Sequence, residues 1–414
     1  MPSTVARRSA LALGMVSAAG LVLGRGRAAE RPVLKIGVLT DLEGVYSEAA
    51  GHGSVIATRM AVDDFMAANP DVGFRVEMSA GDHHNKPDVG ATIARSWFDR
   101  DGVDVITDVP GSAIALAVGT LAREKDKVAL FGGAGTMELS GRACSANQVL
   151  TTYDTYSLVA GTVRPLVASG ADTWFFITAD YVFGHSLDDE ATRFIDTAGA
   201  KVVGRVSYPF PGTTDFSSYL VAAQASRAKM VALMMSGDDM SNCLKQAHEF
   251  GLTQGGQRIA AGIMLITNVH AAGLEATQGV VNTTPFYWDL SDATRAFAKR
   301  FAAQYHGVMP TLLHAGAYSG ALHYLKAAQQ IGPARARASG RAVIEEMKHI
   351  PMDDPLLGRG MIRKDGRAVR SMWLAQIKTP AQSAYPWDYY TILKELPADE
   401  IIRPVSPDCA FVRS

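Results

Sequence analysis

Short apolar segments alternate with amphipathic segments along most of the chain. Residues 33–39 are typical of a buried strand, and the helix predicted after them carries Val55, Val62 and Phe65 on one face. Helical segments of about 10 to 15 residues separate nearly all of the later apolar runs. We predict further strands at 74–78, 103–107, 128–131, 174–178, 201–207, 230–235 and 259–264. This alternation indicates an α/β fold with parallel sheets covered by helices on both faces.

So many strands are better divided between two sheets than placed in one. A change of composition at residues 151–156 offers a first boundary, and a second crossing is possible at 282–289. Long helices are predicted at 291–305 and 312–330 with no strand between them, so they must cover an existing sheet. We therefore expect two doubly wound parallel-sheet lobes.

The first residues follow a different pattern. Arg7 and Arg8 precede an apolar run at 10–23, and the small residues Gly26 and Ala28 follow it. This is the three-part pattern of an export signal, and the run of about 14 residues is shorter than the roughly 20 that cross a bilayer. We predict a signal peptide at residues 1–28 and an exported protein without membrane insertion. The paired arginines leave open the general and the twin-arginine export routes.

Removing this segment makes the chain mildly acidic. Without its four arginines, 36 of the 40 Lys and Arg side chains remain against 41 acidic ones, a formal net charge of −5. A chain of this charge has no electrostatic footprint for nucleic acid.

The glycine-rich segment "FGGAGT" at 131–136 directly follows a predicted strand, at the end where open parallel sheets bind ligands. It does not match a dinucleotide-binding loop, because Glu138 stands where a third small residue is needed, and no Gly-Lys-Ser/Thr of a phosphate loop follows. Backbone amides and the Thr136 hydroxyl remain, which suit a carboxylate or another small polar group. A plain turn is the alternative.

Other strand ends carry comparable groups. Tyr46, Tyr181 and Phe183 can supply apolar walls. Asp238 and Asp239 open a predicted helix, where they can cap its N-terminus or receive a ligand ammonium group. The two roles are compatible if one carboxylate caps and the other faces the ligand.

Signals for catalysis or metal binding are weak. Asp82, His83 and His84 could ligate a metal, but no partner pair with zinc-site spacing occurs, and a surface or loop role is expected. There is no Gly-x-Ser-x-Gly nucleophile motif. His185 is the remaining histidine worth testing, although a polar residue at a helix start explains it. We expect no enzyme activity, no cofactor and no metal.

For the three cysteines we predict one free thiol and one disulfide. Cys243 lies on the apolar stripe of a predicted helix and should be a buried free thiol. Cys144 and Cys409 are then natural partners for a disulfide in an oxidising compartment, with two free thiols as the alternative.

Several segments together resemble the type I periplasmic solute-binding proteins of the branched-chain amino acid (Leu/Ile/Val-binding) class. They are "LKIGVLTDLEGVYSE", "GAGTMELSGRACSAN", "DTWFFITADYVFGHSL", "TTDFSSYLVAAQAS" and "PMDDPLLGRGMIRKDGR". The resemblance implies two lobes joined by three hinge crossings, with the third near 353–357. Lobe 1 is then expected at 29–152 and 287–355, and lobe 2 at 153–286 and 356–400. The tail at 401–414 would return to lobe 1.

The resemblance also implies a function: capture of a small solute, such as an amino acid or another small carboxylate or amide, for an ABC importer in the periplasm. The expected partners are a membrane permease and an ATPase. It places Ser112, Ala134, Gly135 and Thr136 at the ligand carboxylate, with Tyr181 and Phe183 across the cleft and Asp238 or Asp239 near an ammonium group. Gly111 stands where relatives often carry a hydroxyl residue. A soluble ligand sensor of the same fold is the alternative function.

Overall fold

The computed structural model describes residues 1–3 and 31–412. Residues 32–412 belong to one compact unit. Apart from its first three residues, the predicted signal peptide lies outside the described residues. None of the described helices is both long enough and apolar enough to span a bilayer.

The first sheet has five parallel strands in the order β2-β1-β3-β4-β5. The central strands β3 and β4 are short and buried at every residue, as expected for a parallel sheet between helix layers. β2 lies at an edge, and none of its residues is buried. The strands are β1 (Val33–Thr40), β2 (Arg75–Asp82), β3 (Val105–Asp108), β4 (Val128–Phe131) and β5 (Gln148–Leu150).

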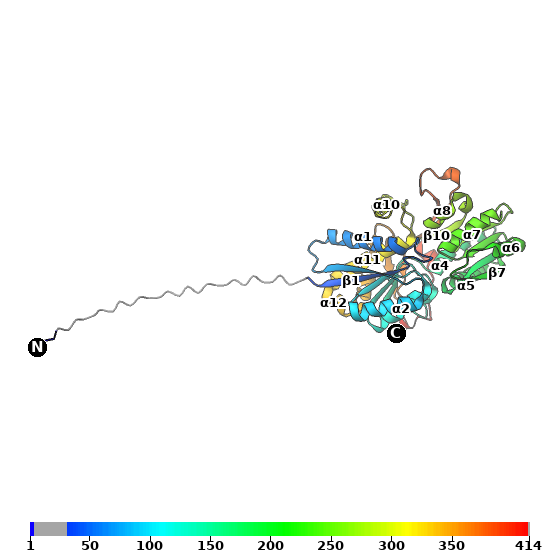
Figure 1. Cartoon of the computed structure of the whole chain (residues 1–414). Coiled ribbons are helices and arrows are strands. Elements are labelled where there is room, and N and C mark those ends of the chain that lie inside the picture. The colour runs from blue at the N-terminus through cyan, green and yellow to red at the C-terminus, as the bar shows by residue number, and fades with distance from the viewer. Residues whose placement is uncertain (4–30, 413–414) are drawn as a thin grey trace. The chain divides into compact units, whose positions relative to one another are not determined.

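Helices cover both faces of this sheet (Figure 1). α1 packs against α11, which is buried along most of its length, and α2 packs against α3. These helices are α1 (Gly51–Ala68), α2 (Pro87–Ser96), α3 (Ser112–Glu124), α10 (Asp292–Gln304), α11 (Leu312–Ile331), α12 (Pro333–Ala338) and α13 (Gly340–His349). We call the five-stranded sheet and these helices the first lobe.

The second sheet has seven strands in the order β15-β14-β10-β9-β8-β6-β7. Its strands are β6 (Thr173–Asp180), β7 (Lys201–Pro209), β8 (Met230–Met234), β9 (Arg258–Ala261), β10 (Val281–Thr284), β14 (Met372–Ile377) and β15 (Tyr390–Leu396). β6 to β10 are parallel, whereas β14 and β15 add to one edge in antiparallel pairing. The predicted α/β fold is confirmed, and its second sheet is mixed.

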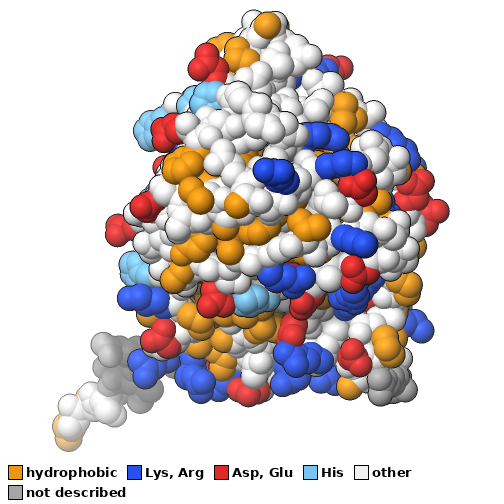
Figure 2. All heavy atoms as spheres, turned by 90° about the vertical axis from the view of Figure 1, so that its right-hand side faces the viewer, with side chains coloured by type: hydrophobic (Ala, Val, Ile, Leu, Met, Phe, Trp, Pro, Cys, Tyr) orange, Lys and Arg blue, Asp and Glu red, His pale blue; other side chains and the backbone are white. Residues whose placement is uncertain are grey.

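The helices of the second sheet are α4 (Thr155–Ala168), α5 (Val182–Thr197), α6 (Ser217–Ser226), α7 (Asp238–Glu249), α8 (Ile266–Ala272) and α9 (Leu274–Thr277). With the sheet they form the second lobe. Its outer face, on the side of α6 and β7, mixes acidic, basic and apolar side chains (Figure 2). This face therefore offers a charged partner no extended surface of one sign.

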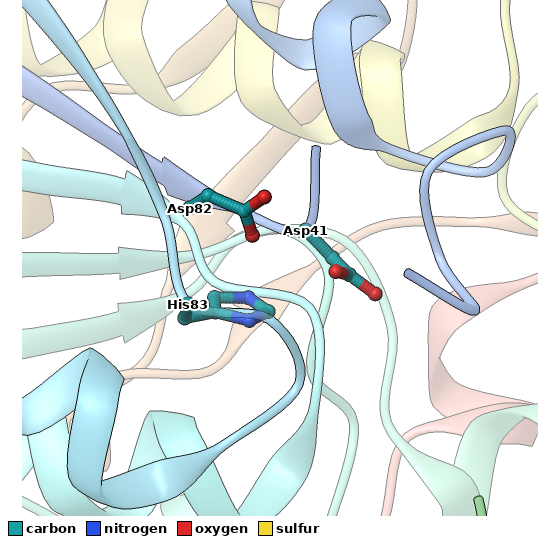
Figure 3. Close-up of side chains that lie close together, drawn as sticks. All are labelled: Asp41, Asp82 and His83. Carbon is teal, nitrogen blue, oxygen red and sulfur yellow. The ribbon is translucent and has the colours of Figure 1, made fainter. Parts of the chain in front are cut away.

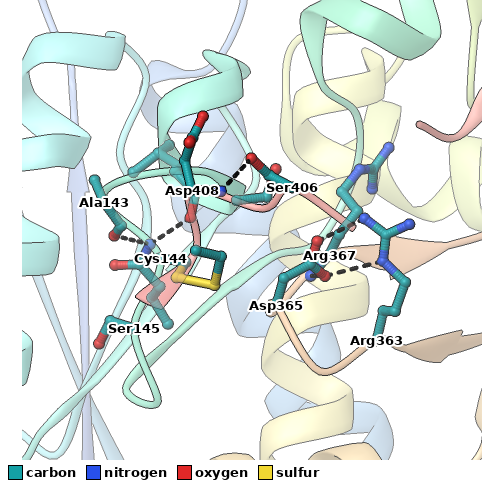
Figure 4. The surroundings of a disulfide bond; sticks show 12 residues. Ala143, Cys144, Ser145, Arg363, Asp365, Arg367, Ser406 and Asp408 are labelled. Carbon is teal, nitrogen blue, oxygen red and sulfur yellow. Dashed lines mark hydrogen bonds and ion pairs between the residues drawn. A yellow bond between two sulfur atoms is a disulfide. The ribbon is translucent and has the colours of Figure 1, made fainter. Parts of the chain in front are cut away.

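The last part of the chain returns to the first lobe. Three short strands, β11 (Met352–Asp354), β12 (Gly358–Ile362) and β13 (Ala368–Val369), form a small sheet of their own, and α14 (Ala398–Ile401) follows β15. A disulfide then joins Cys409 to Cys144, with 5.6 Å between their Cα atoms (Figure 4). The predicted disulfide is thus present, and Cys243 is a buried free thiol.

Candidate functional site

A small cavity lies where the strand ends of the two lobes meet. Tyr46, Gly111, Ser112, Gly133, Tyr153 and Leu313 line it from the first lobe and the start of α4, and Tyr181, Phe183 and Ser236 line it from the second lobe. The centre of a water molecule can occupy about 10 Å³ of it, which is room for about one water. A solute can therefore enter only if the lobes or their side chains move apart.

Ser112 begins helix α3 at the wall of this cavity. Gly111, directly before it, has φ +102°, a conformation that favours glycine. The Ser112 side chain is buried, yet its Oγ atom has no hydrogen-bond partner. A buried hydroxyl at the N-terminus of a helix, beside free first-turn amides, is suited to receive a carboxylate.

The glycine-rich loop lies beside Ser112. The amides of Gly132 and Gly133 donate to the Asp108 carbonyl oxygen at 3.1 and 3.0 Å, and the Tyr153 hydroxyl donates to the Gly133 carbonyl at 3.0 Å. Gly135 packs so closely that a Cβ atom there would lie 2.5 Å from the Tyr153 ring. The loop is therefore held in one shape against the aromatic wall.

Not all predicted residues of the glycine-rich loop line this cavity. Gly133 lines the cavity, whereas Ala134 and Gly135 are packed beside it. Thr136 lines a different, open pocket between the first-lobe loop and α5, and its Oγ1 atom accepts a long hydrogen bond from the Glu138 amide.

Aromatic rings close the cavity from both lobes. The hydroxyl oxygens of Tyr46 and Tyr181 are 2.7 Å apart, so one hydrogen bond joins the two lobes. Tyr181 stacks on Phe210 with ring centroids 4.2 Å apart, and Phe183 meets Tyr153 edge to face at 6.4 Å. Burial raises the pKa of both Tyr46 and Tyr181, so their hydroxyls stay protonated and serve as neutral hydrogen-bonding groups.

Neither of the two predicted acidic residues lines this cavity. Asp239 accepts a hydrogen bond of 2.8 Å from the Tyr208 hydroxyl, and burial raises its pKa to about 6. Asp238 lines a second cavity between the lobes together with Glu48, and its pKa is raised by desolvation and by the Glu48 charge. Its amide donates to the Val45 carbonyl at 3.3 Å, a backbone link between the lobes.

Asp41, Asp82 and His83 bring their side chains together at the strand ends of the first sheet (Figure 3). The Asp41 carboxylate accepts the amides of Gly44 and Tyr46, both at 3.0 Å. His83 Nδ1 accepts a hydrogen bond from the Asn85 amide at 3.0 Å. The neutral ring therefore carries its proton on Nε2 and has no lone pair free for a metal. The geometry fits a loop-stabilising cluster better than a metal site.

His185 lies in the first turn of α5, as expected for a polar residue at a helix start. Its Nε2 atom is 2.8 Å from Asp180 Oδ1, and both side chains are exposed.

Sequence reasoning did not identify several residues at the cavity. Tyr153 and Leu313 line it, and Phe210 supports Tyr181 from outside. Ser236 also lines it and lies in the strand-end segment 236–239 that the sequence indicates, whereas Tyr153 follows β5, a strand that the sequence did not predict. Leu313 comes from helix α11, far along the chain, and no local pattern indicates it.

Comparison with known proteins identifies the class. Residues 33–383 match the family described as periplasmic binding protein. A periplasmic binding protein from Burkholderia mallei is 38% identical, with a TM-score of 0.85 and coverage of 92% of this chain and 99% of the other. A branched-chain amino acid ABC transporter periplasmic ligand-binding protein from Burkholderia xenovorans is 37% identical, with a TM-score of 0.79 and coverage of 91% and 99%.

A more distant structure shares the fold alone. It is the leucine-, isoleucine-, valine-, threonine- and alanine-binding protein from Brucella ovis, 21% identical, with a TM-score of 0.78 and coverage of 92% and 98%. A comparison with curated protein sequences gave no match.

The two-lobed fold and the cavity between the strand ends define a solute-binding protein. The chain belongs to the periplasmic binding protein family. The cavity between its two lobes is the place where it captures a small solute.

Proposed function

We propose that the solute is a small carboxylate, or the corresponding amide, with a compact apolar or aromatic body. The observation that carries this proposal is the lining of the small cavity. Hydroxyl groups and the N-terminus of α3 face aromatic rings there, and none of the described residues that line it is charged. Such a lining favours one polar group on the solute and an uncharged remainder.

The carboxylate would meet the Ser112 hydroxyl and the free amides of the first turn of α3. Hydrogen bonds to a charged group contribute about 1.5–3 kcal/mol each, and the helix N-terminus adds roughly 0.3–1 kcal/mol. Micromolar affinity corresponds to about 8 kcal/mol in total. Two or three such bonds together with burial of the apolar body against Tyr46, Tyr181 and Phe183 suffice.

Closure of the lobes would drive capture. In the structure the Tyr46–Tyr181 hydrogen bond spans a cavity with room for about one water. A solute must separate these hydroxyls to enter and then contacts both lobes at once. Only such contacts, made in the closed form and absent from the open one, shift the equilibrium towards closure.

An amino acid is the second candidate solute. The Asp239 charge is near enough to Tyr46 to raise the pKa of that tyrosine further, so a carboxylate is within electrostatic reach of the aromatic wall. Only its Oδ2 atom accepts from Tyr208, and a carboxylate can accept further hydrogen bonds, so Asp239 can bind an ammonium group without releasing Tyr208.

We further propose the expected lobe boundaries, 29–152 with 287–355 and 153–286 with 356–400, and a periplasmic location after removal of residues 1–28. The proposed partners are the permease and ATPase subunits of an importer, which would dock on the closed lobes.

Thermal-shift measurements on the protein without residues 1–28 test the solute class. The panel contains benzoate, phenylacetate, benzamide, leucine and urea. A solute at 100 times its dissociation constant stabilises the fold by about 2.7 kcal/mol. We expect the largest shifts from the aromatic carboxylates. A shift from leucine alone, lost on Asp239→Asn, would replace our proposal with the amino acid alternative.

A further inference from the structure

Asp108 is a buried acid directly behind the cavity. It ends strand β3 and is completely buried, and neither of its carboxyl oxygens has a hydrogen-bond partner of good geometry. The Thr40 and Ser54 hydroxyls beside it are also buried and lack partners of good geometry. A charged carboxylate in these surroundings would be stabilised by neither water nor a cation.

The backbone at Asp108 builds the carboxylate site that we propose. Asp108 and the β-branched Val109 have φ +77° and +52°, a left-handed conformation that costs energy at both positions. This turn leads into Gly111 and Ser112, and the Asp108 carbonyl holds the amides of Gly132 and Gly133. The backbone of Asp108 is therefore fixed next to the residues that line the cavity, and its side chain lies beside Thr40 and Ser54.

The charge on Asp108 also acts on a residue that lines the cavity: burial raises the pKa of Tyr153, and Tyr46 and the Asp108 charge raise it further. A second negative charge in the cavity would interact with Asp108 through the same low-dielectric interior. An ionised Asp108 would thus oppose an anionic solute.

We propose that Asp108 is a specificity-determining residue that must be a neutral acid for an anionic solute to bind, which makes capture of a carboxylate coupled to uptake of a proton. This inference rests on the proposed carboxylate solute. The uncharged amide of the same shape is not subject to the coupling.

The neighbouring histidines do not offer a positive charge that would stabilise an ionised Asp108. Burial raises the pKa of Asp108 to about 7, and the Thr40 and Ser54 hydroxyls oppose this rise only in part. Burial lowers the pKa of His83 and of His314, on α11, to about 4, so both rings are neutral near pH 7. Asp41, beside Thr40, accepts two amides in its own loop.

Titration calorimetry with benzoate and benzamide between pH 6 and 8.5 tests the coupling. We expect benzoate affinity to fall about tenfold per pH unit above neutrality, with proton uptake detected as a difference between phosphate and Tris buffers. Benzamide affinity should not change. In Asp108→Asn, benzoate should bind equally well over the whole range. The control His185→Gln, which removes an exposed titratable group, should keep the wild-type slope.

Benzoate affinity that is constant with pH in the wild type, without proton uptake, would overturn the inference even if benzoate binds well. If neither probe binds at any pH, the proposed solute class fails. The protonation state of Asp108 is then measured in the free protein. Carboxyl ¹³C NMR of the free protein, assigned by comparison with Asp108→Asn, should show Asp108 titrating near neutrality. Titration near pH 4 would refute a neutral Asp108.

Discussion

Replacing Ser112 with alanine should separate binding from stability. The Ser112 hydroxyl is buried and unpartnered in the free protein, a state that costs about 1–3 kcal/mol when a polar group loses water without gaining a bond. Ser112→Ala removes this cost and enlarges the cavity only by the space of the lost hydroxyl oxygen. We therefore expect the free energy of unfolding, measured by urea denaturation, to stay unchanged or to rise by about 1 kcal/mol.

The same change should weaken solute binding. Loss of one hydrogen bond to a carboxylate costs about 1.5–3 kcal/mol, which is a roughly 10- to 150-fold rise in the dissociation constant. Calorimetry with the best carboxylate of the solute panel measures it. Ser319→Ala is the matched control, because the Ser319 hydroxyl donates to buried Asp354 at 2.7 Å and lies on α11. That variant should lose stability and keep its affinity.

The reasoning about Ser112 fails if Ser112→Ala binds the carboxylate as tightly as the wild type. It also fails if the variant loses as much stability as Ser319→Ala, because Ser112 would then have a structural partner.

Three further predictions concern stability. Reduction of the Cys144–Cys409 disulfide, or Cys409→Ser, should lower the free energy of unfolding by at most about 5–6 kcal/mol from chain entropy, and urea denaturation with and without reductant should then give equal results for Cys409→Ser. Arg367→Met should lower the free energy of unfolding by about 3–5 kcal/mol, because it leaves buried Asp154 without its cation. Burial alone would raise the pKa of Asp154, but Arg367 lowers it overall. The loss of stability in the variant should therefore shrink as acid protonates Asp154. Native Asp239, with its pKa raised to about 6, keeps a proton between about pH 4 and 6 that the unfolded chain has released, so its contribution to stability is lost as the pH rises through this range. Asp239→Asn should therefore flatten the fall in melting temperature from pH 4 to pH 6. An unchanged slope would contradict this.

The sequence predicted those elements whose signal is local. Runs such as 128–131 and 230–235 are apolar throughout and coincide closely with β4 and β8, and the helices predicted at 291–305 and 312–330 are α10 and α11. β10 has the polar sequence VNTT and was anticipated only as a crossing. Its buried Thr283 is 2.9 Å from Thr162 through their hydroxyl oxygens, a pairing across distant segments that no periodicity reveals.

The site residues also fall into those that the sequence indicates and those that only tertiary packing determines. Tyr46, Ser112, Tyr181 and Phe183 were predicted because strand ends of parallel sheets meet at one edge, and the structure places all four around one cavity. The side-chain partners of the acids were not predictable. Asp239 turns to Tyr208, and Asp238 faces Glu48, because of how separate loops pack against each other. The antiparallel strands β14 and β15 were missed because they interrupt the β/α alternation.

Each lobe depends on residues from distant parts of the chain, and this has a consequence for folding. α1 near the start packs against α11, and β10 pairs with β14, which lies about 90 residues later in the sequence. Loop closure over such separations is slow, and chain segments made early must wait for their partners. A ribosome would release almost the whole polypeptide before either lobe could become complete. We therefore expect the nascent chain to remain extended and accessible to chaperones or a translocase for longer than a chain whose lobes are contiguous.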